Sequence, residues 1–319
     1  MTDDVQARRP AEVGIMLPAS GAADSERYDV IAAARLAEEL GFDSIWTVDH
    51  LAFHTGILEP VTVLAAACGV TGRVSLGFGV LLAAMRHPAW VAKQIASLQV
   101  LSGDRVVLGV GVGGENPGEW AAAGVPVAQR GRRTDAFLDV LPDLAAGRPA
   151  RLPQPWDAPV PVLAPTGVVP PVWVGGRSRA AIERAAARAD GWLGLWVDAG
   201  QLARRRAALL ARARELGRPR PRAGVTVLVH VDDRDPDHAR AESARFLRAQ
   251  YGGPVDRLMP YVVAGTGAEV AAGLASLVTA GADQLVLLPG AADYPAQYHR
   301  LAELRHELPD RLVSVGERS

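Results

Sequence analysis

The sequence predicts a single α/β domain in which eight parallel strands close into a (β/α)8 TIM barrel, spanning residues 13–319 behind a polar tail at residues 1–12. Short apolar runs alternate with helical patterns along the chain, which is the pattern of consecutive βα units. Eight such units can be counted, and eight strands close into a barrel with no edge left unpaired. A length of 319 residues also suits one barrel. An open, doubly wound sheet is the alternative that the same alternation allows.

Composition and charge describe an ordinary globular protein. Hydrophobic residues make up 49% of the chain and charged residues 22%, which is enough to build a large core. The formal net charge is -1. Because no broad basic field results, we expect neither a nucleic acid nor a membrane surface as a partner.

The single cysteine and the N-terminal tail narrow the class further. Cys68 excludes an internal disulfide and a cysteine-cluster metal site, and its apolar neighbours place it in the core. We expect no metal site. The tail lacks the apolar segment of a secretion signal, and no apolar run reaches the roughly 20 residues that a membrane helix needs. The cytoplasm is therefore the expected compartment.

The first four βα units follow each other closely. One helix covers about residues 26–40 and stops at Gly41, a residue suited to a left-handed cap. The next two helices start at Pro60 and Pro88, because proline suits the first helical turn, and a fourth helical region ends near Ala146. The expected strands are residues 13–17, 44–48, 74–78 and 105–110.

A proline-rich segment separates these units from the rest. Its prolines are Pro149, Pro153, Pro155, Pro159, Pro161, Pro165, Pro170 and Pro171. Since the βα alternation resumes afterwards, we interpret residues 147–171 as an insertion loop over the barrel mouth, between the fourth helix and the fifth strand, rather than as a domain linker. The expected strands that follow are residues 172–174, 191–195, 225–230 and 284–288, and the last helix covers about 292–307.

Ionisable residues follow the second and third strands, at the end of a barrel where ligands bind. The second strand leads into Asp49 and His50. A histidine can donate to a ligand carbonyl or move a proton near neutral pH, so both residues are candidate catalytic groups. The alternative is that Asp49 bonds loop amides and His50 fills a pocket wall. Arg86 and His87, after the third strand, are interpreted as loop and cap residues.

The fourth strand runs into glycines. Gly109, Gly111 and Gly114 match G-x-G-x-x-G, a motif that is weak by itself. A dinucleotide-binding sheet carries this motif on its first βα turn, with an acid about 20 residues later at the next strand end. Here the motif follows the fourth strand, and the acids at that spacing fall in a helix. We expect the glycines instead to let a planar ring approach the backbone.

The fifth strand ends in Gly175, Gly176, Arg177 and Ser178, directly before a helix. Bare backbone N–H groups, a helix N-terminus and a guanidinium together form an anion site, so the segment predicts a bound phosphate. The alternative is a tight turn capped by Ser178. Many barrels bind phosphate after strands seven and eight, so this position departs from the general rule.

Five segments in register carry a family resemblance. They are residues 40–50 (LGFDSIWTVDH), 86–88 (RHP), 101–111 (LSGDRVVLGVG), 172–176 (VWVGG) and 189–192 (ADGW). In this order they resemble the luciferase-like flavin-dependent family. That family includes monooxygenases that use FMN, and it also includes dehydrogenases and reductases that use the deazaflavin F420. The resemblance covers residues 13 to about 290.

The resemblance implies a ring of reduced FMN or F420 at the barrel mouth, and a non-prolyl cis peptide at Gly79-Val80 against its central face. His50 and Asp49 match positions that line the cofactor in deazaflavin members. Some deazaflavin dehydrogenases carry an acid where this chain has Gly114, so Glu115, one residue later, is a candidate for proton transfer. The implied cofactor-binding residues are Gly79, Val80, Gly111, Gly113, Gly114, Gly175, Gly176, Arg177, Ser178 and Trp196.

The function implied by the resemblance is two-electron redox chemistry on a small organic substrate, by hydride transfer or by monooxygenation. A flavin-binding barrel without turnover and an NAD(P)-dependent dehydrogenase are the alternatives. The sequence leaves open whether FMN or F420 binds, and the substrate depends on loops such as 147–171. Family likeness also implies a homodimer, with the apolar helices near 60–70 and 88–101 as a candidate interface.

Overall fold

Eight parallel strands close into a barrel, which confirms the predicted fold class. The computed structural model describes residues 6–21, 29–114 and 116–314. Each strand pairs with its neighbours in the ring, and the ring closes because β11 pairs with both β10 and β12. In order around the barrel, the strands are β2 (Glu12–Met16), β4 (Ser44–Thr47), β6 (Ser75–Phe78), β7 (Val106–Val110), β10 (Val172–Gly175), β11 (Gly191–Leu195), β12 (Arg222–Val231) and β14 (Gln284–Pro289).

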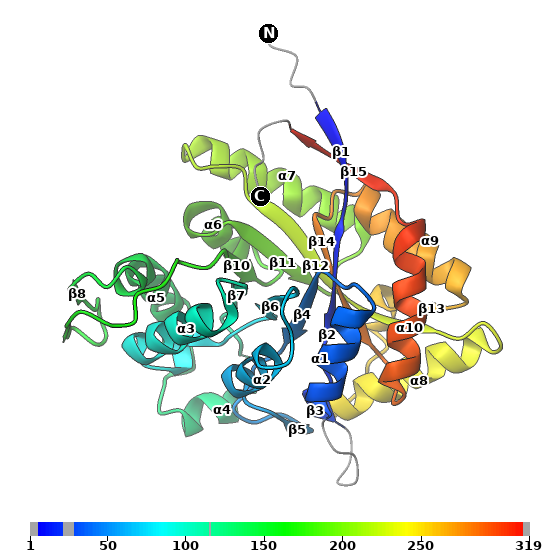
Figure 1. Cartoon of the computed structure of the whole chain (residues 1–319), viewed down its shortest axis with the longest axis horizontal. Coiled ribbons are helices and arrows are strands. Elements are labelled where there is room, and N and C mark those ends of the chain that lie inside the picture. The colour runs from blue at the N-terminus through cyan, green and yellow to red at the C-terminus, as the bar shows by residue number, and fades with distance from the viewer. Residues whose placement is uncertain (1–5, 22–28, 115, 315–319) are drawn as a thin grey trace.

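Helices form an outer layer around the barrel (Figure 1). α2 and α3 begin at the predicted Pro60 and Pro88, and Gly41 follows α1 with a φ of 78°. α1 begins at Val30, and Asp29 caps it by accepting the N–H of Ala32; the predicted helical residues 26–28 lie outside the described residues. The helices are α1 (Val30–Glu39), α2 (Pro60–Cys68), α3 (Pro88–Ser102), α4 (Pro117–Ala122), α5 (Arg130–Ala145), α6 (Arg179–Arg188), α7 (Ala199–Glu215), α8 (Pro236–Tyr251), α9 (Gly267–Thr279) and α10 (Tyr294–Leu304).

Bulky side chains fill part of the barrel interior. Met16, Trp46, Trp173, Leu193 and Val286 form one buried cluster inside the ring. Glycine makes room for it: a Cβ atom at Gly77 would lie 2.2 Å from the indole of Trp46. The barrel interior is therefore a packed core. The open space lies above it, at the carboxyl ends of the strands.

One strand that joins the barrel sheet was not among the predicted strands. β13 (Val263–Gly265) pairs in parallel with the last residues of β12, from Val229 to Val231. β11 pairs with the earlier part of the same strand, so the long β12 serves two partners on this side. Three residues are too few to show a strand periodicity, which is why the pattern along the chain does not reveal β13.

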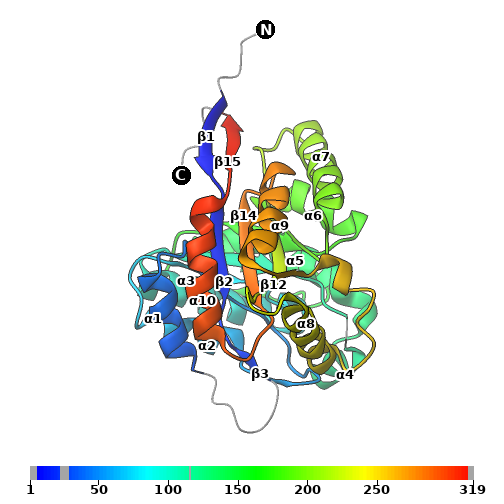
Figure 2. The ribbon, with the colours of Figure 1, turned by 90° about the vertical axis from the view of Figure 1, so that its right-hand side faces the viewer.

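The two ends of the described chain meet in a ribbon outside the barrel. β1 (Gln6–Pro10) pairs antiparallel with β15 (Asp310–Ser314). Figures 1 and 2 show this ribbon projecting from the end of the barrel opposite the mouth. Residues 6–10 were expected in a polar tail, and a strand forms there because its partner is supplied from the far end of the chain.

The proline-rich insertion lies on the side of the barrel, so its predicted position over the mouth is wrong. Gln99 of α3 donates from Nε2 to the carbonyl of Val168 at 3.0 Å. The guanidinium of Arg133 on α5 lies 4.3 Å from the centre of the Trp156 ring. Within the insertion, β8 (Ala150–Arg151) pairs with β9 (Pro159–Val160), and Figure 1 shows β8 beside α5. Buried apolar groups and one aromatic contact attach the insertion to these helices, which proline content alone cannot indicate.

Three further findings concern the described residues. Cys68 is buried, as predicted. No helix within these ranges combines the length and apolar character needed to cross a membrane. Nor do the described His, Cys, Asp and Glu side chains gather in groups of three or more that could hold a metal ion.

Candidate functional site

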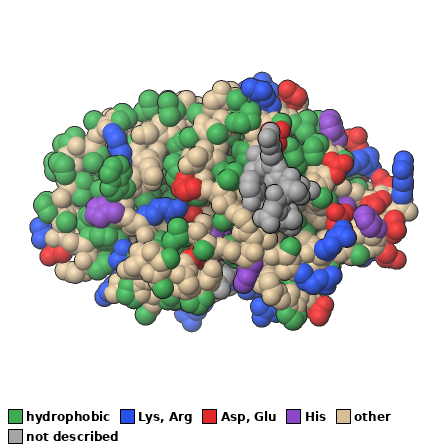
Figure 3. Space-filling view, turned by 90° about the horizontal axis from the view of Figure 1, so that it is seen from below, with side chains coloured by type: hydrophobic (Ala, Val, Ile, Leu, Met, Phe, Trp, Pro, Cys, Tyr) green, Lys and Arg blue, Asp and Glu red, His purple; other side chains and the backbone are tan. Residues whose placement is uncertain are grey.

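A cavity of about 260 Å³ opens at the carboxyl ends of the strands. This size lies just below the range of about 300–1,000 Å³ typical of small-molecule sites. Figure 3 views the molecule from this end, where hydrophobic, acidic and basic side chains are mixed over the surface. The cavity is lined mainly by apolar side chains and glycines, and its polar lining residues include Asp49, His50, Arg177, Thr226 and Gln250.

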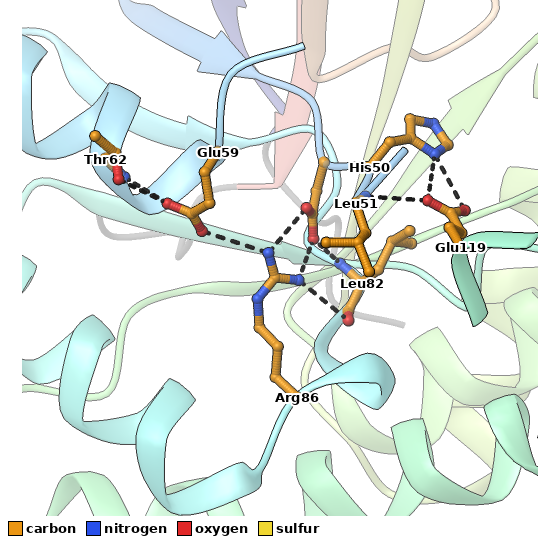
Figure 4. A network of polar contacts seen from close by, with 8 residues as sticks. His50, Leu51, Glu59, Thr62, Leu82, Arg86 and Glu119 are labelled. Atoms are coloured by element: carbon orange, nitrogen blue, oxygen red, sulfur yellow. Dashed lines mark hydrogen bonds and ion pairs between the residues drawn. The ribbon is translucent and has the colours of Figure 1, made fainter. Parts of the chain in front are cut away.

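His50 reaches the cavity with one ring nitrogen already engaged. It follows β4, and its Nδ1 lies 3.2 Å from both carboxylate oxygens of Glu119 (Figure 4). The side chain of Glu119 is fully buried, whereas that of His50 is 15% exposed. A carboxylate accepts hydrogen bonds, so in the neutral ring this contact places the proton on Nδ1 and leaves Nε2 as the acceptor. The His50 side chain is part of the cavity lining.

Glu119 is held in place by the backbone as well as by His50. It lies in the first turn of α4, which begins at Pro117 after the cap residue Asn116. The N–H of Leu51 donates to Oε2 of Glu119 at 3.1 Å. Glu119 was not predicted as a site residue. Its sequence neighbourhood indicates only the start of a helix, and its contact with His50 depends on two βα loops that meet in the folded barrel.

Asp49, the neighbour of His50, is engaged in a different network. Arg86 donates to its two carboxylate oxygens at 2.6 and 3.0 Å, and the N–H of Leu82 donates at 2.7 Å (Figure 4). Burial by itself would lower the pKa of Arg86, but the hydrogen bond and charge of Asp49, assisted by Glu59, raise it. Arg86, expected as a loop or cap residue, is instead the ion-pair partner of Asp49. This pair holds the loop after β6 against the loop after β4.

Val80 forms a ledge in the cavity at the end of β6. The Gly79-Val80 peptide is cis, as the family resemblance implied. A Cβ atom at Gly111 would lie 2.3 Å from Cγ2 of Val80, and one at Gly175 would lie 2.8 Å from Cγ1. These glycines therefore make room for Val80. The expectation that they leave space directly for a ring is revised: the glycines accommodate the ledge, and the ledge faces the cavity.

The segment after β10 has the geometry of an anion site. Gly176, with a φ of 126°, receives a hydrogen bond on its carbonyl from Trp192 Nε1 at 2.7 Å. Ser178 caps α6 by accepting the N–H of Ala181 at 3.2 Å. The remaining first-turn N–H groups have no partner inside the helix, and the exposed Arg177 adds a positive charge at the cavity edge. These donors fit a phosphate.

Aromatic residues form part of the cavity wall. Phe53 stacks on the ring of His50 with 4.1 Å between ring centres, and it meets Tyr251 edge-on at 5.6 Å. Trp196, which follows β11, meets the same tyrosine at 6.0 Å. Phe53 and Tyr251 were not predicted, because neither the loop after β4 nor the end of α8 carries a motif.

The structure brings most of the predicted site residues to this one cavity. Those that line it are Asp49, His50, Gly79, Val80, Gly111, Gly113, Gly175, Gly176, Arg177 and Trp196. Gly114 lies outside the lining, and a Cβ atom there would meet Arg130 at 3.2 Å. Ser178 acts as the helix cap and is also outside the lining. Glu115 lies outside the described residues.

Comparison with known proteins places the geometry in context. Residues 11–284 match the model of the luciferase-like monooxygenases. An uncharacterized protein of Mycobacterium tuberculosis is 36% identical over 218 residues, which cover 61% of this chain and 73% of the relative. The F420-dependent glucose-6-phosphate dehydrogenase of Beutenbergia cavernae is 41% identical over 118 residues, which cover 35% of this chain and 34% of the relative.

Solved structures share the fold at low sequence identity. An F420-dependent secondary alcohol dehydrogenase, in complex with an F420–acetone adduct, has a TM-score of 0.81 and 19% identity, covering 94% of this chain and 99% of that one. A type II Baeyer-Villiger monooxygenase of Pseudomonas putida, in complex with FMN, has a TM-score of 0.74 and 20% identity, covering 93% and 96%. Homologues and structural neighbours thus use F420 or FMN.

Proposed function

Because this chain belongs to the luciferase-like monooxygenase family, we propose that it is an oxidoreductase that binds F420 or reduced FMN at the barrel mouth. Its reaction is hydride transfer with, or monooxygenation of, a small organic substrate. The observation that carries the proposal is His50: the buried carboxylate of Glu119 engages its Nδ1, and its ring lines a cavity that Arg177 also lines.

The residues present fit a flavin-type cofactor. Val80 offers an apolar ledge for a flat ring. The guanidinium of Arg177 and the N–H groups that begin α6 offer a place for its phosphate, whereas the N–H of Gly176 already donates to the carbonyl of Leu193 at 3.2 Å. Most of the residues that line the cavity are apolar, and such a lining suits a tricyclic ring better than a sugar. When bound, such a ring supplies the acceptor or donor of two electrons, and the protein supplies orientation and charge.

His50 is the residue we assign to proton transfer. With Nδ1–H held by Glu119, Nε2 can accept the hydroxyl proton of a substrate alcohol while the carbon loses a hydride to the ring. The substrate then becomes a carbonyl compound, and the imidazolium that forms is stabilised by the carboxylate of Glu119. Asp49 has no such role in this proposal, because Arg86 and Leu82 already occupy its oxygens. It holds the loop that carries His50.

Monooxygenation is the second candidate reaction. It is favoured by a relative, the 4-hydroxyprotoasukamycin monooxygenase of Streptomyces nodosus, which is 34% identical over 115 residues. The same cavity would then hold FMN, and the aromatic wall of Phe53, Trp196 and Tyr251 would exclude water from it.

The two alternatives from the sequence fare differently. A dinucleotide site is disfavoured because the barrel is closed and because Cβ positions at Gly109 and Gly111 already face Phe78 and Val80. A flavin-binding barrel without turnover would need the cavity but would not need the contact that orients His50. A measurement of turnover distinguishes such a binding protein from an enzyme.

The test is a titration of the purified protein with F420, FMN and NADH, each followed by absorbance and fluorescence. We expect F420 or FMN to bind. Anaerobic reduction of bound F420 by secondary alcohols would support hydride transfer, whereas oxygen-dependent product formation with reduced FMN would support monooxygenation. Tight binding of NADH alone would overturn the proposal, and binding without any turnover would leave the non-catalytic alternative.

We also propose that the protein is a homodimer that uses the outer face of α3. Trp90 and Leu101 on this helix are each 70% exposed and Val100 is 56% exposed. Large apolar side chains on one face favour a protein interface. Sedimentation at working concentration should give a dimer, and a monomer would exclude this proposal.

A further inference from the structure

A second concave site lies on the outer wall of the barrel, between α6 and α7. It is a groove of about 930 Å³, and Figure 1 shows the two helices side by side. One end of the groove begins at Arg177, which also lines the central cavity. The groove therefore continues from the segment to which we assigned a phosphate.

Positive charge dominates the groove. Arg177, Arg179, Arg204, Arg205 and Arg212 line it, and its acidic members are Glu183 and Glu215. The small side chains of Ala208 and Ala211 also line the groove.

The acidic residues are already occupied by one of these arginines. Arg212 donates to Glu183 and to Glu215, each at 2.9 Å. Arg179 is 3.9 Å from Glu183, at the limit of an ion pair, and its side chain is 94% exposed. The two carboxylates of the groove are thus already in contact with Arg212 and, for Glu183, with Arg179.

Three arginines remain without a carboxylate partner among the described residues. Arg205 donates to the carbonyl of Arg177 at 3.1 Å and to Gln201 at 3.2 Å, which ties α7 to the loop after β10. The side chains of Arg177 and Arg204 make no hydrogen bond or ion pair within the described ranges. Like charges that line one groove repel one another, and an anion bound there would relieve the repulsion.

We propose that the α6–α7 groove is a second anion-binding subsite, for the carboxylate or phosphate groups of a small polyanion. Arg204 and Arg205 bind those groups, and Arg177 links the subsite to the cavity. One source of such groups is the distal part of a cofactor that carries negative charge beyond its phosphate. The other source is a separate anionic ligand. FMN ends at its phosphate and would leave the groove empty.

The first experiment uses tripolyphosphate as the probe and does not need a bound cofactor. Calorimetric titration of the full chain at low salt should show binding that Arg204→Gln weakens by about fivefold, that Arg204→Lys partly restores, and that salt suppresses. Arg214→Gln is the matched control, because Arg214 is exposed on α7 but does not line the groove. Equal effects of Arg204→Gln and Arg214→Gln, or no binding, would overturn the proposal.

The second experiment distinguishes the two sources and rests on the proposed function. If the cofactor extends into the groove, tripolyphosphate should compete with F420 but not with FMN, and Arg204→Gln should weaken F420 binding alone. If tripolyphosphate binds equally well to the F420-loaded protein, the subsite belongs to a separate anion. Failure of both cofactors to bind would contradict the proposed function, while the tripolyphosphate result would still decide the subsite.

Discussion

The two halves of the barrel contribute different chemistry to the same cavity. The loops after β4, β6 and β7 supply ionisable side chains in pairs, Asp49 with Arg86 and His50 with Glu119. The loops after β10 and β11 supply backbone donors, one exposed arginine and the aromatic Trp196. In the proposed function, the first half moves protons and the second half holds the ligand.

Pairing explains why the first half can carry so much charge close to an apolar cavity. A buried carboxylate is costly unless hydrogen bonds and an opposite charge compensate it. Asp49 has both, and Glu119 receives the N–H of Leu51 and the ring of His50. Backbone amides bind an anion without placing a buried charge in the unliganded protein, which suits the second half.

Replacing His50 should have the largest effect and tests the first half directly. We expect His50→Asn to lower turnover by about 10²–10⁴-fold, the usual contribution of a general acid or base, while cofactor affinity stays nearly constant. Stopped-flow reduction and equilibrium titration measure the two quantities. Glu119→Gln should give a smaller loss and displace the pH profile, because it keeps the ring but removes the charge. A His50→Asn enzyme with normal turnover would remove the proton-transfer role.

Breaking the Asp49 pair should affect stability rather than chemistry alone. In Asp49→Asn, Arg86 loses its buried partner, and such a loss costs about 3 kcal/mol in the free energy of unfolding. Urea denaturation measures it. The pair of Arg148 and Asp143, whose side chains are 59% and 49% exposed, gives the matched control, since Asp143→Asn should change stability little. Equal costs for the two variants would show that burial of the Asp49 pair is unimportant.

A substitution in the second half should weaken binding and spare the chemical step. Gly176 has a φ of 126°, which an alanine adopts only with strain, so Gly176→Ala should displace the neighbouring amides and reduce cofactor affinity by about tenfold. Turnover of the saturated enzyme should remain. Gly217→Ala is the control, because Gly217 also has a positive φ, 65°, with open space around it. If both variants bind the cofactor like the wild type, the anion site lies elsewhere.

The smallest effect should come from His230, a histidine of the second half that does not line the cavity. Burial lowers its pKa, although Glu242, 3.6 Å away, and Asp232 partly oppose this, and His238 adds to the lowering. Its folded pKa lies below the ordinary 6.5, so the folded state resists protonation. Stability is therefore complete above about pH 6.5 and falls as the pH drops toward the folded pKa.

Thermal unfolding between pH 5 and 8 tests this expectation. His230→Gln should flatten the acid side of the Tm profile by about 1–2 °C relative to the wild type. His238→Gln, at an exposed position beside it, should leave most of that slope in place. An unchanged slope in His230→Gln would show that other groups set the acid sensitivity.

Particular residues show how far prediction from the sequence reached. Pro60, Pro88 and Gly41 predicted helix ends, because these residues act on the backbone of their own turn. Asp49 and His50 were found because a strand end in a barrel is a ligand position. Phe53 and Tyr251 were missed, since an aromatic residue in a loop or late in a helix carries no local sign of what it faces.

By itself, the sequence determined the order of eight βα units, the strand ends that carry ionisable groups, and the segment suited to an anion, because periodicity and turn chemistry are properties of short segments. Only the tertiary structure decided which groups are partners. Glu119 meets His50 across 69 residues, and Arg86 meets Asp49 across 37, because barrel closure brings their loops together. The position of the insertion on the outer wall also depends on tertiary contacts, which it makes with α3 and α5.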